Sequence, residues 1–180
     1  LHLGGILLLV GGGLTAMFSS EGNMVIEEGA QSNHVEDYHL MELAVINTSA
    51  TSFDEFTIFD RPLLKRNQIL RHPNLNFEIE ILNYLENCEP AKRTSPAGIQ
   101  YKGMLKNFML NELIPEKEDN WNRPGLIYQI NNTGTRADGM YGIFLGQSVS
   151  QTVSINDKDF TIILRRKRTY LPFSIELLDF

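Results

Sequence analysis

The stretch FEIEILNY at residues 77–84 decides the fold class, because apolar and polar residues alternate along its first half. Its apolar residues Phe77, Ile79 and Ile81 fall on one face of an extended chain, and the two glutamates between them fall on the other. This period of two predicts a β-strand with one buried and one solvated face. The stretch FSIELLDF at residues 173–180 repeats Phe, Ile, Glu and Leu in the same places. It fits either an equivalent strand of the same domain or the general likeness of amphipathic strands.

Similar alternation, interrupted by Gly, Pro, Asn and Asp, continues through most of the chain after Glu21. The dipeptide Asn156-Asp157 predicts a tight hairpin turn. Residues 104–113 fit either a short helix or a strand. The fold class predicted from these features is mainly β, an antiparallel β-sandwich or barrel-like domain. Its further predicted strands are Tyr38–Ile46, Phe53–Phe59, Ile127–Ile130, Gly142–Val153 and Phe160–Arg168, and its long irregular stretches are Asn87–Lys102 and Pro115–Gly125.

The first twenty residues, LHLGGILLLVGGGLTAMFSS, contain no Asp, Glu, Lys or Arg. The apolar run from Leu3 to Phe18 is shorter than the ~20 residues that span a bilayer, but the chain starts inside the run. Its glycines are tolerated in membrane helices, where small residues allow close helix packing. We therefore expect residues 1–20 to be the C-terminal part of one transmembrane α-helix. A secretory signal sequence and a buried helix of a soluble protein are the alternatives.

This interpretation divides the chain into a membrane segment, residues 1–20, and an extracytoplasmic β-rich domain, residues 21–180. The chain begins inside an apolar run and ends at Phe180 within a predicted strand. We therefore expect it to be a fragment, with the β-rich domain incomplete at its C-terminus.

Composition excludes some classes of function. The chain has 180 residues and a net charge of −6, whereas nucleic-acid binders usually have a basic domain or a concentrated basic face, so no nucleic-acid partner is expected. The single cysteine, Cys88, cannot form an internal disulfide, and no Cys/His pattern around it resembles a zinc site. We interpret it as a small apolar residue.

No catalytic residue and no metal site is predicted. Gly11-Gly12-Gly13 lacks the Lys-Ser/Thr of a phosphate-binding loop, and no nucleophile elbow is present. His34 and His39 are five residues apart, an odd spacing that places them on opposite faces of a strand, and His72 precedes Pro73 in a turn.

Two surface features have competing interpretations. The cluster Arg165-Arg166-Lys167-Arg168 could bind anionic headgroups or haem propionates, but it is more typical of a charged strand end that discourages edge pairing. Alternation along a strand would place Arg165 and Lys167 on one face and the other two residues of the cluster on the opposite face. Trp121, among polar residues, could cap the core or mark a contact surface.

Motifs at the two ends of the chain resemble the ResB-like family, the membrane component of the system II pathway of cytochrome c maturation. At the N-terminus these are His2-Leu3-Gly4, the sequence FSSEG at residues 18–22 and MVIEEG at residues 24–29. Near the C-terminus, RTYLPFSIELLDF at residues 168–180 resembles the family strand L-P-F-x-I-x-L-x-D-F. The middle of the chain is compatible with the family and less diagnostic.

The resemblance implies a role in haem export and in presentation of haem to apocytochrome c, without catalysis by this chain. The implied partners are a ResC/CcsA-like membrane protein, apocytochrome c and the lipid bilayer. The implied location is the bacterial cytoplasmic (inner) membrane, with the soluble domain on the extracytoplasmic side. His2 occupies the H-x-G position and is the candidate axial ligand of the transported haem. The competing hypothesis is a membrane-anchored β-domain that binds a protein or an envelope ligand.

Overall fold

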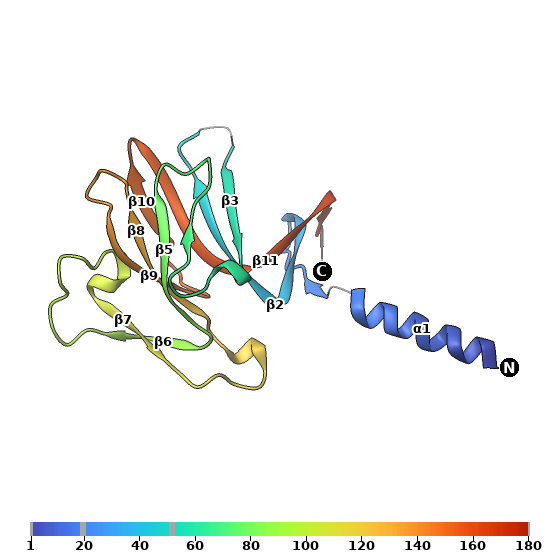
Figure 1. The fold of residues 1–180 in the computed structure, drawn as a ribbon. Helices are drawn as coiled ribbons and strands as arrows, with labels where there is room; N and C mark the ends of the chain where they lie inside the picture. Colours follow the sequence, from blue (N-terminus) through green and yellow to red (C-terminus); the bar gives the residue numbers. More distant parts are fainter. Residues whose placement is uncertain (1, 19–20, 51–52, 180) are drawn as a thin grey trace. The chain divides into compact units, whose positions relative to one another are not determined.

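The computed structural model describes residues 2–18, 21–50 and 53–179, and it consists of one N-terminal helix followed by antiparallel β-structure (Figure 1). The prediction of a mainly β chain is confirmed. In chain order its elements, with η for 3₁₀ helices, are α1 (His2–Phe18), β1 (Gly22–Asn23), β2 (Gln31–Asn47), β3 (Glu55–Asp60), η1 (Arg61–Leu63), β4 (Ile69–Leu70), β5 (Glu78–Leu85), β6 (Cys88–Lys92), η2 (Gly103–Lys106), β7 (Phe108–Glu112), η3 (Asp119–Trp121), β8 (Gly125–Asn131), β9 (Gly139–Phe144), β10 (Gln151–Ile155) and β11 (Lys158–Glu176).

The chain divides into two compact units. The smaller unit, which we call the terminal unit, comprises residues 1–38 and 168–180. The larger one, the β-unit, comprises residues 39–167. The long strands β2 and β11 contribute residues to both units.

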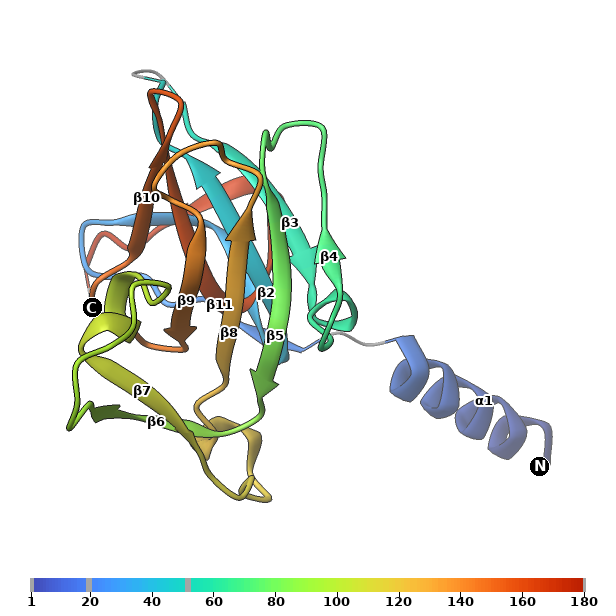
Figure 2. The ribbon, with the colours of Figure 1, turned by 60° about the vertical axis from the view of Figure 1, so that its left-hand side comes forward.

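Two sheets face each other in the β-unit, as Figure 2 shows for the layer β4-β5-β8-β9 and the layer that contains β2, β3, β10 and β11. The first layer has the strand order β4-β5-β8-β9, and in the second β3 and β11 both pair with β2. Side chains of both layers meet in one hydrophobic core. There the ring centroids of Phe77 and Phe160 lie 5.0 Å apart in an edge-to-face arrangement. The core residues include Met41, Leu43, Val45, Ile79, Ile81, Leu126, Tyr128, Ile130, Tyr141, Ile143, Ile155, Phe160, Ile162 and Leu164.

The opposite face of β2 and β11 carries a buried ion pair. Glu42 lies between the core residues Met41 and Leu43, so its side chain points away from the core. Its Oε1 accepts a hydrogen bond of 2.8 Å from Nε of Arg165, and the two side chains are 3% and 9% exposed. Asp60, the register partner of Glu42 on β3, pairs with Lys167 at 2.9 Å. The basic cluster is therefore partly neutralised by acidic residues of the same sheet.

The terminal unit joins the segment after α1 to the last strand of the chain. β1 pairs with β2 through Gly22 and Asp37. Further along, the backbone N–H of Gly29 donates to the carbonyl of Leu177 at 2.7 Å, and the N–H of Leu177 donates to the carbonyl of Ala30 at 3.0 Å. These hydrogen bonds join segments nearly 150 residues apart in sequence.

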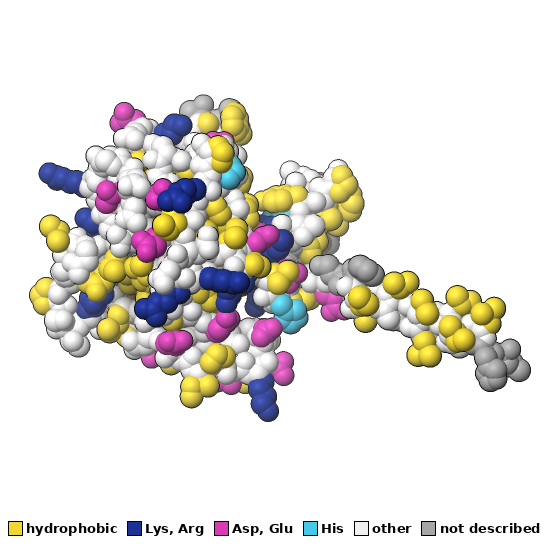
Figure 3. All heavy atoms as spheres, in the orientation of Figure 1, with side chains coloured by type: hydrophobic (Ala, Val, Ile, Leu, Met, Phe, Trp, Pro, Cys, Tyr) yellow, Lys and Arg dark blue, Asp and Glu magenta, His cyan; other side chains and the backbone are white. Residues whose placement is uncertain are grey.

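Helix α1 confirms the helical part of the prediction for residues 1–20. Its described side chains are exposed and mostly apolar, and Figure 3 shows no charged side chain along it. At a rise of 1.5 Å per residue its 17 residues extend about 25 Å, against a bilayer core of about 30 Å. Among the described residues, no helix has the length and apolarity needed to cross a membrane, so the predicted transmembrane span is not supported.

Several finer predictions need correction. The barrel-like alternative is wrong, because no sheet in the described part of the chain closes on itself. The predicted strand Gly142–Val153 is two strands, β9 and β10, separated by a turn in which Gly146 has φ +79°. The predicted irregular stretch Asn87–Lys102 contains β6, and residues 104–113 contain both the end of η2 and β7. The hairpin turn at Asn156-Asp157 is confirmed, with φ of 50° and 60° at the two residues.

Removing one partner of the buried ion pair should destabilise the chain strongly. We expect Glu42→Ala to lower the free energy of unfolding by about 3–5 kcal/mol, because the Arg165 guanidinium would stay buried without its counter-ion. Urea unfolding followed by circular dichroism measures the change. The exposed Glu89→Ala should stay within about 0.5 kcal/mol of wild type, and the double replacement Glu42→Leu with Arg165→Met should recover most of the loss. Equal effects of the two alanine variants would contradict this account.

The stacked core residues Tyr128 and Tyr141 allow a matched test of how much a buried tyrosine hydroxyl contributes to stability. The hydroxyl of Tyr141 donates to the carbonyl of Ala137 at 2.8 Å, whereas the buried hydroxyl of Tyr128 has no hydrogen-bond partner among the described residues. We expect Tyr141→Phe to cost about 1 kcal/mol of unfolding free energy, and Tyr128→Phe to be neutral or stabilising by up to about 1 kcal/mol. Thermal and urea unfolding of both variants measures the two changes in unfolding free energy. A larger loss in Tyr128→Phe than in Tyr141→Phe would contradict this prediction.

Candidate functional site: a charged pocket at the end of the core

A polar cavity of the β-unit lies where the core between the two sheets ends. On β2 the core-facing residues Val45, Leu43 and Met41 are followed at the next position of the same face by His39. On β11 the core-facing Leu164 is followed in the same way by Arg166. His39, Met41 and Arg166 line a pocket of about 300 Å³. Ionisable side chains thus replace apolar ones where the core opens.

A β-bulge in β5 turns two further residues toward this pocket. The register of β5 with β8 shifts between Ile81 and Asn83, so the parity of the inward positions changes. After the bulge Tyr84 pairs with the core residue Leu126, and Tyr84 itself packs against the core. Tyr84 and Glu86 both line the pocket. Without the extra residue, the alternation begun at Ile81 would have placed Tyr84 on the opposite face.

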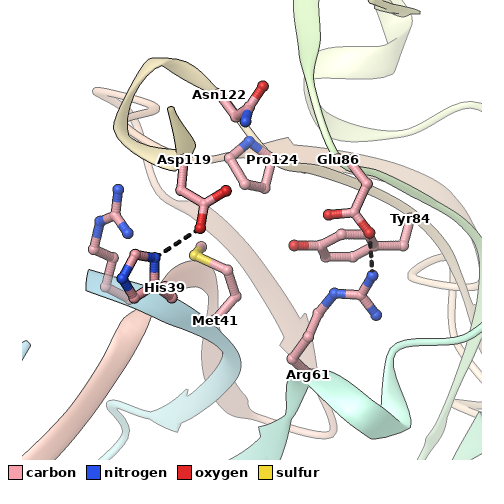
Figure 4. Close-up of a pocket in the computed structure, with 9 residues that line it drawn as sticks. His39, Met41, Arg61, Tyr84, Glu86, Asp119, Asn122 and Pro124 are labelled. Atoms are coloured by element: carbon pink, nitrogen blue, oxygen red, sulfur yellow. Dashed lines mark hydrogen bonds and ion pairs between the residues drawn. The ribbon is translucent and has the colours of Figure 1, made fainter. Parts of the chain in front are cut away.

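Four ionisable side chains of the pocket form two pairs, which Figure 4 shows on opposite walls. On one wall Nδ1 of His39 lies 2.7 Å from Oδ2 of Asp119. On the other, Nη2 of Arg61 donates to Oε1 of Glu86 at 2.6 Å, and its guanidinium lies 3.6 Å from the centre of the Tyr84 ring. Burial raises the pKa of Tyr84 to about 12, and Arg61 opposes that shift to a smaller extent. Tyr84 is therefore a neutral phenol at physiological pH.

The loop that completes the pocket is held by side-chain amides. Asn122, which lines the pocket, accepts a hydrogen bond from the N–H of Glu116 at 2.8 Å and donates to its carbonyl at 3.1 Å. Asn87 donates to the carbonyl of Ile114 and accepts from the N–H of Arg123. These bonds fix both ends of the segment that carries Asp119. The irregular stretch predicted at Pro115–Gly125 is thus an ordered loop with a short η3.

The pocket is suited to recognition by charge and hydrogen bonding. Its described lining residues include a histidine–carboxylate pair but no Ser, Thr or Cys that this pair could activate. The described residues also contain no group of three or more His, Cys, Asp or Glu side chains that could hold a metal ion. The guanidinium groups of Arg61 and Arg166 instead provide donors that match carboxylates.

The structure brings together few of the residues singled out in the sequence. His2 is the first residue of α1, but its side chain lies outside those described, so its role as a haem ligand stays a prediction. His34 and His39 lie five apart on the single strand β2, with the ring of His34 5.7 Å from that of Tyr170 and His39 lining the pocket. His72 accepts a hydrogen bond from the N–H of Asn74 in its turn.

The basic cluster separates into different environments. Arg165 pairs with Glu42 and Lys167 with Asp60, on the face that the alternation predicted for both. Arg168 pairs with Glu36 at 2.8 Å. Arg166 lines the pocket and has no ion-pair partner among the described residues. Trp121 is 71% exposed, so the idea that it caps the core is wrong.

Sequence reasoning missed most of the pocket. Arg61 comes from a different segment than Tyr84 and Glu86, and Asp119 lies within the stretch predicted only as irregular, Pro115–Gly125. The available signal was the period of two on β2, which extends from the core positions to His39. No such signal connects a residue of one sheet to a residue of the other.

Comparison with known proteins leaves the family of the chain open. No family model matches it, and no curated protein does. The resemblance to ResB-like proteins therefore depends on the motifs at the two ends of the sequence.

Cys88 should be chemically inert in the folded chain. It is buried, and burial raises the pKa of its thiol to about 11, a shift that nearby Arg123 partly opposes. At pH 8 roughly one thiol in a thousand would be ionised, against roughly a quarter for a free cysteine. We expect a thiol reagent such as dithionitrobenzoate to react at least about a hundredfold more slowly with the native chain than with the chain in concentrated urea. Equal rates in the two states would contradict a buried thiol.

Proposed function

We propose that this chain is a membrane-attached component of cytochrome c maturation, which assists haem export and presentation of haem to apocytochrome c. In this proposal it acts with a ResC/CcsA-like membrane protein and performs no catalysis itself. Its β-unit is an antiparallel β-sandwich on the extracytoplasmic side of the bacterial cytoplasmic (inner) membrane.

The observation that carries the proposal is the meeting of the two motifs on which the family resemblance depends. Residues 18–29 and 168–180 are far apart in sequence, yet both belong to the terminal unit. The hydrogen bond from the N–H of Gly29 to the carbonyl of Leu177 connects the last residue of the first motif to the second. Because both motifs form part of one structural unit, they are more consistent with inheritance from one protein family than with two chance resemblances of amphipathic segments.

The surface of α1 also supports attachment to a membrane. Its described side chains include exposed leucines and no charged residue, which is the composition of a helix that contacts lipid or other apolar helices. An ionisable residue such as His2 in this setting is a functional candidate, and a neutral imidazole is a common haem ligand. The apolar surface suits the porphyrin face, but residues 3–17 contain no Lys or Arg for the propionates, so the partner would supply those contacts.

The second candidate function, a membrane-anchored β-domain that binds a protein, is favoured by the charged pocket and the exposed Trp121. The two candidates assign their functions to different units. Haem handling involves the terminal unit, and protein recognition involves the β-unit.

Haem content tests the first candidate. The chain, co-expressed with a ResC-like partner and purified in mild detergent, should show a haem Soret band. We expect His2→Gly to remove most of that band and added imidazole to restore it, because imidazole can replace the missing ligand. Visible absorption spectroscopy provides the measurement, and His72→Ala, a change in a solvated turn, serves as the matched control.

The outcomes separate the candidates. A band that is unchanged in His2→Gly leaves haem delivery standing and removes His2 as a ligand. The absence of haem from the wild-type complex would contradict haem delivery and favour the protein-binding alternative.

A further inference from the structure

We propose that the charged pocket of the β-unit binds a carboxylate of a polypeptide partner, with Arg166 as the cation that receives it and Trp121 as an apolar contact beside it. The inference depends on the pocket alone and does not require the haem-delivery role.

The first argument is the state of the pocket's charged groups. Glu86 is engaged by Arg61, and Asp119 lies against His39, so each of the two carboxylates on the walls has a partner. Arg166 is the remaining cation of the lining, and the described residues give it no ion pair. It is half-buried, and its fork of N–H donors is the geometry that carboxylates match best. Arg166 is therefore the cation of the lining that no carboxylate of the described residues pairs with.

The second argument concerns the loop between Leu113 and Pro124. It exposes 88% of Ile114 and 71% of Trp121, although the amides of Asn87 and Asn122 hold its backbone. An exposed tryptophan on an ordered loop loses little conformational freedom on binding, and Trp, Tyr and Arg are the residue types that dominate protein interfaces. Trp121 lies between two pocket residues in sequence, so a partner that reached Arg166 would have this apolar surface nearby.

The third argument is size. A cavity of about 300 Å³ is at the small end of ligand sites and accepts one short side chain with its carboxylate. A small carboxylic acid that only filled the cavity would leave the exposed side chains of Trp121 and Ile114 in contact with solvent. A polypeptide segment that carries an acidic residue near an apolar one satisfies the pocket and the loop together.

Trp121 is the single tryptophan of the chain, so its fluorescence reports directly on this site. The probes are acetylated and amidated peptides in which Leu and Asp are separated by zero to three glycines, each paired with the same peptide carrying Asn. We expect at least one Asp peptide to change the emission saturably, and its Asn counterpart to bind roughly tenfold to a hundredfold more weakly. Arg166→Gln should cause a similar loss, whereas Arg136→Gln, an exposed arginine outside the pocket, should not.

Calorimetry with Trp121→Ala and with sodium acetate distinguishes the sources of the carboxylate. Weaker peptide binding in Trp121→Ala, with acetate binding poorly to the wild type, supports a polypeptide ligand. Acetate that binds as tightly as the best peptide would overturn the polypeptide assignment. Equal affinity for Asp and Asn peptides, no effect of Arg166→Gln, or no binding of any probe at millimolar concentration would overturn the carboxylate site. None of these results depends on whether the preparation contains haem.

Discussion

Burial of inward-facing side chains between two sheets is the interaction on which the β-unit depends. Each strand offers alternate residues to this core, so the same alternation determines what lies on the outer face. The outward Glu42 and Arg165 are buried as well, and they can be so because each neutralises the other. The pocket is also a product of this alternation, since it forms where the inward row of β2 continues beyond its apolar positions to His39.

The sequence was informative where a local rule decides the structure. The period of two predicted β5, and Asn156-Asp157 predicted its hairpin because both residues tolerate positive φ. It was less informative where the decision is not local. The break at Gly146 was missed because alternate positions beyond it still include Val149 and Val153. Strand β6 was missed because Pro90 and its neighbours resemble a loop. Pro90 is tolerated there because β6 belongs to a ribbon of two strands.

The candidate site was the least predictable part. Its residues come from five separate segments, and two of them face the pocket only because β5 contains a bulge. Bulges have no dependable sequence signature here, since Leu82 is an ordinary strand residue. The sequence neighbours of each histidine and carboxylate therefore gave no indication of the pocket. The pairing of His39 with Asp119 spans 80 positions and becomes visible only in the folded chain.

The route of the chain through β2 and β11 has a further consequence. These strands are hydrogen-bonded neighbours, and residues 48–157 lie between them in sequence. In sequence, the β-unit is therefore an insertion between the two segments that form the terminal unit. The sequence of such an insertion can become longer, change, or be replaced by another domain without any change in the two segments that form the terminal unit. Homologous chains could thus keep the same ends while differing widely in the module between them.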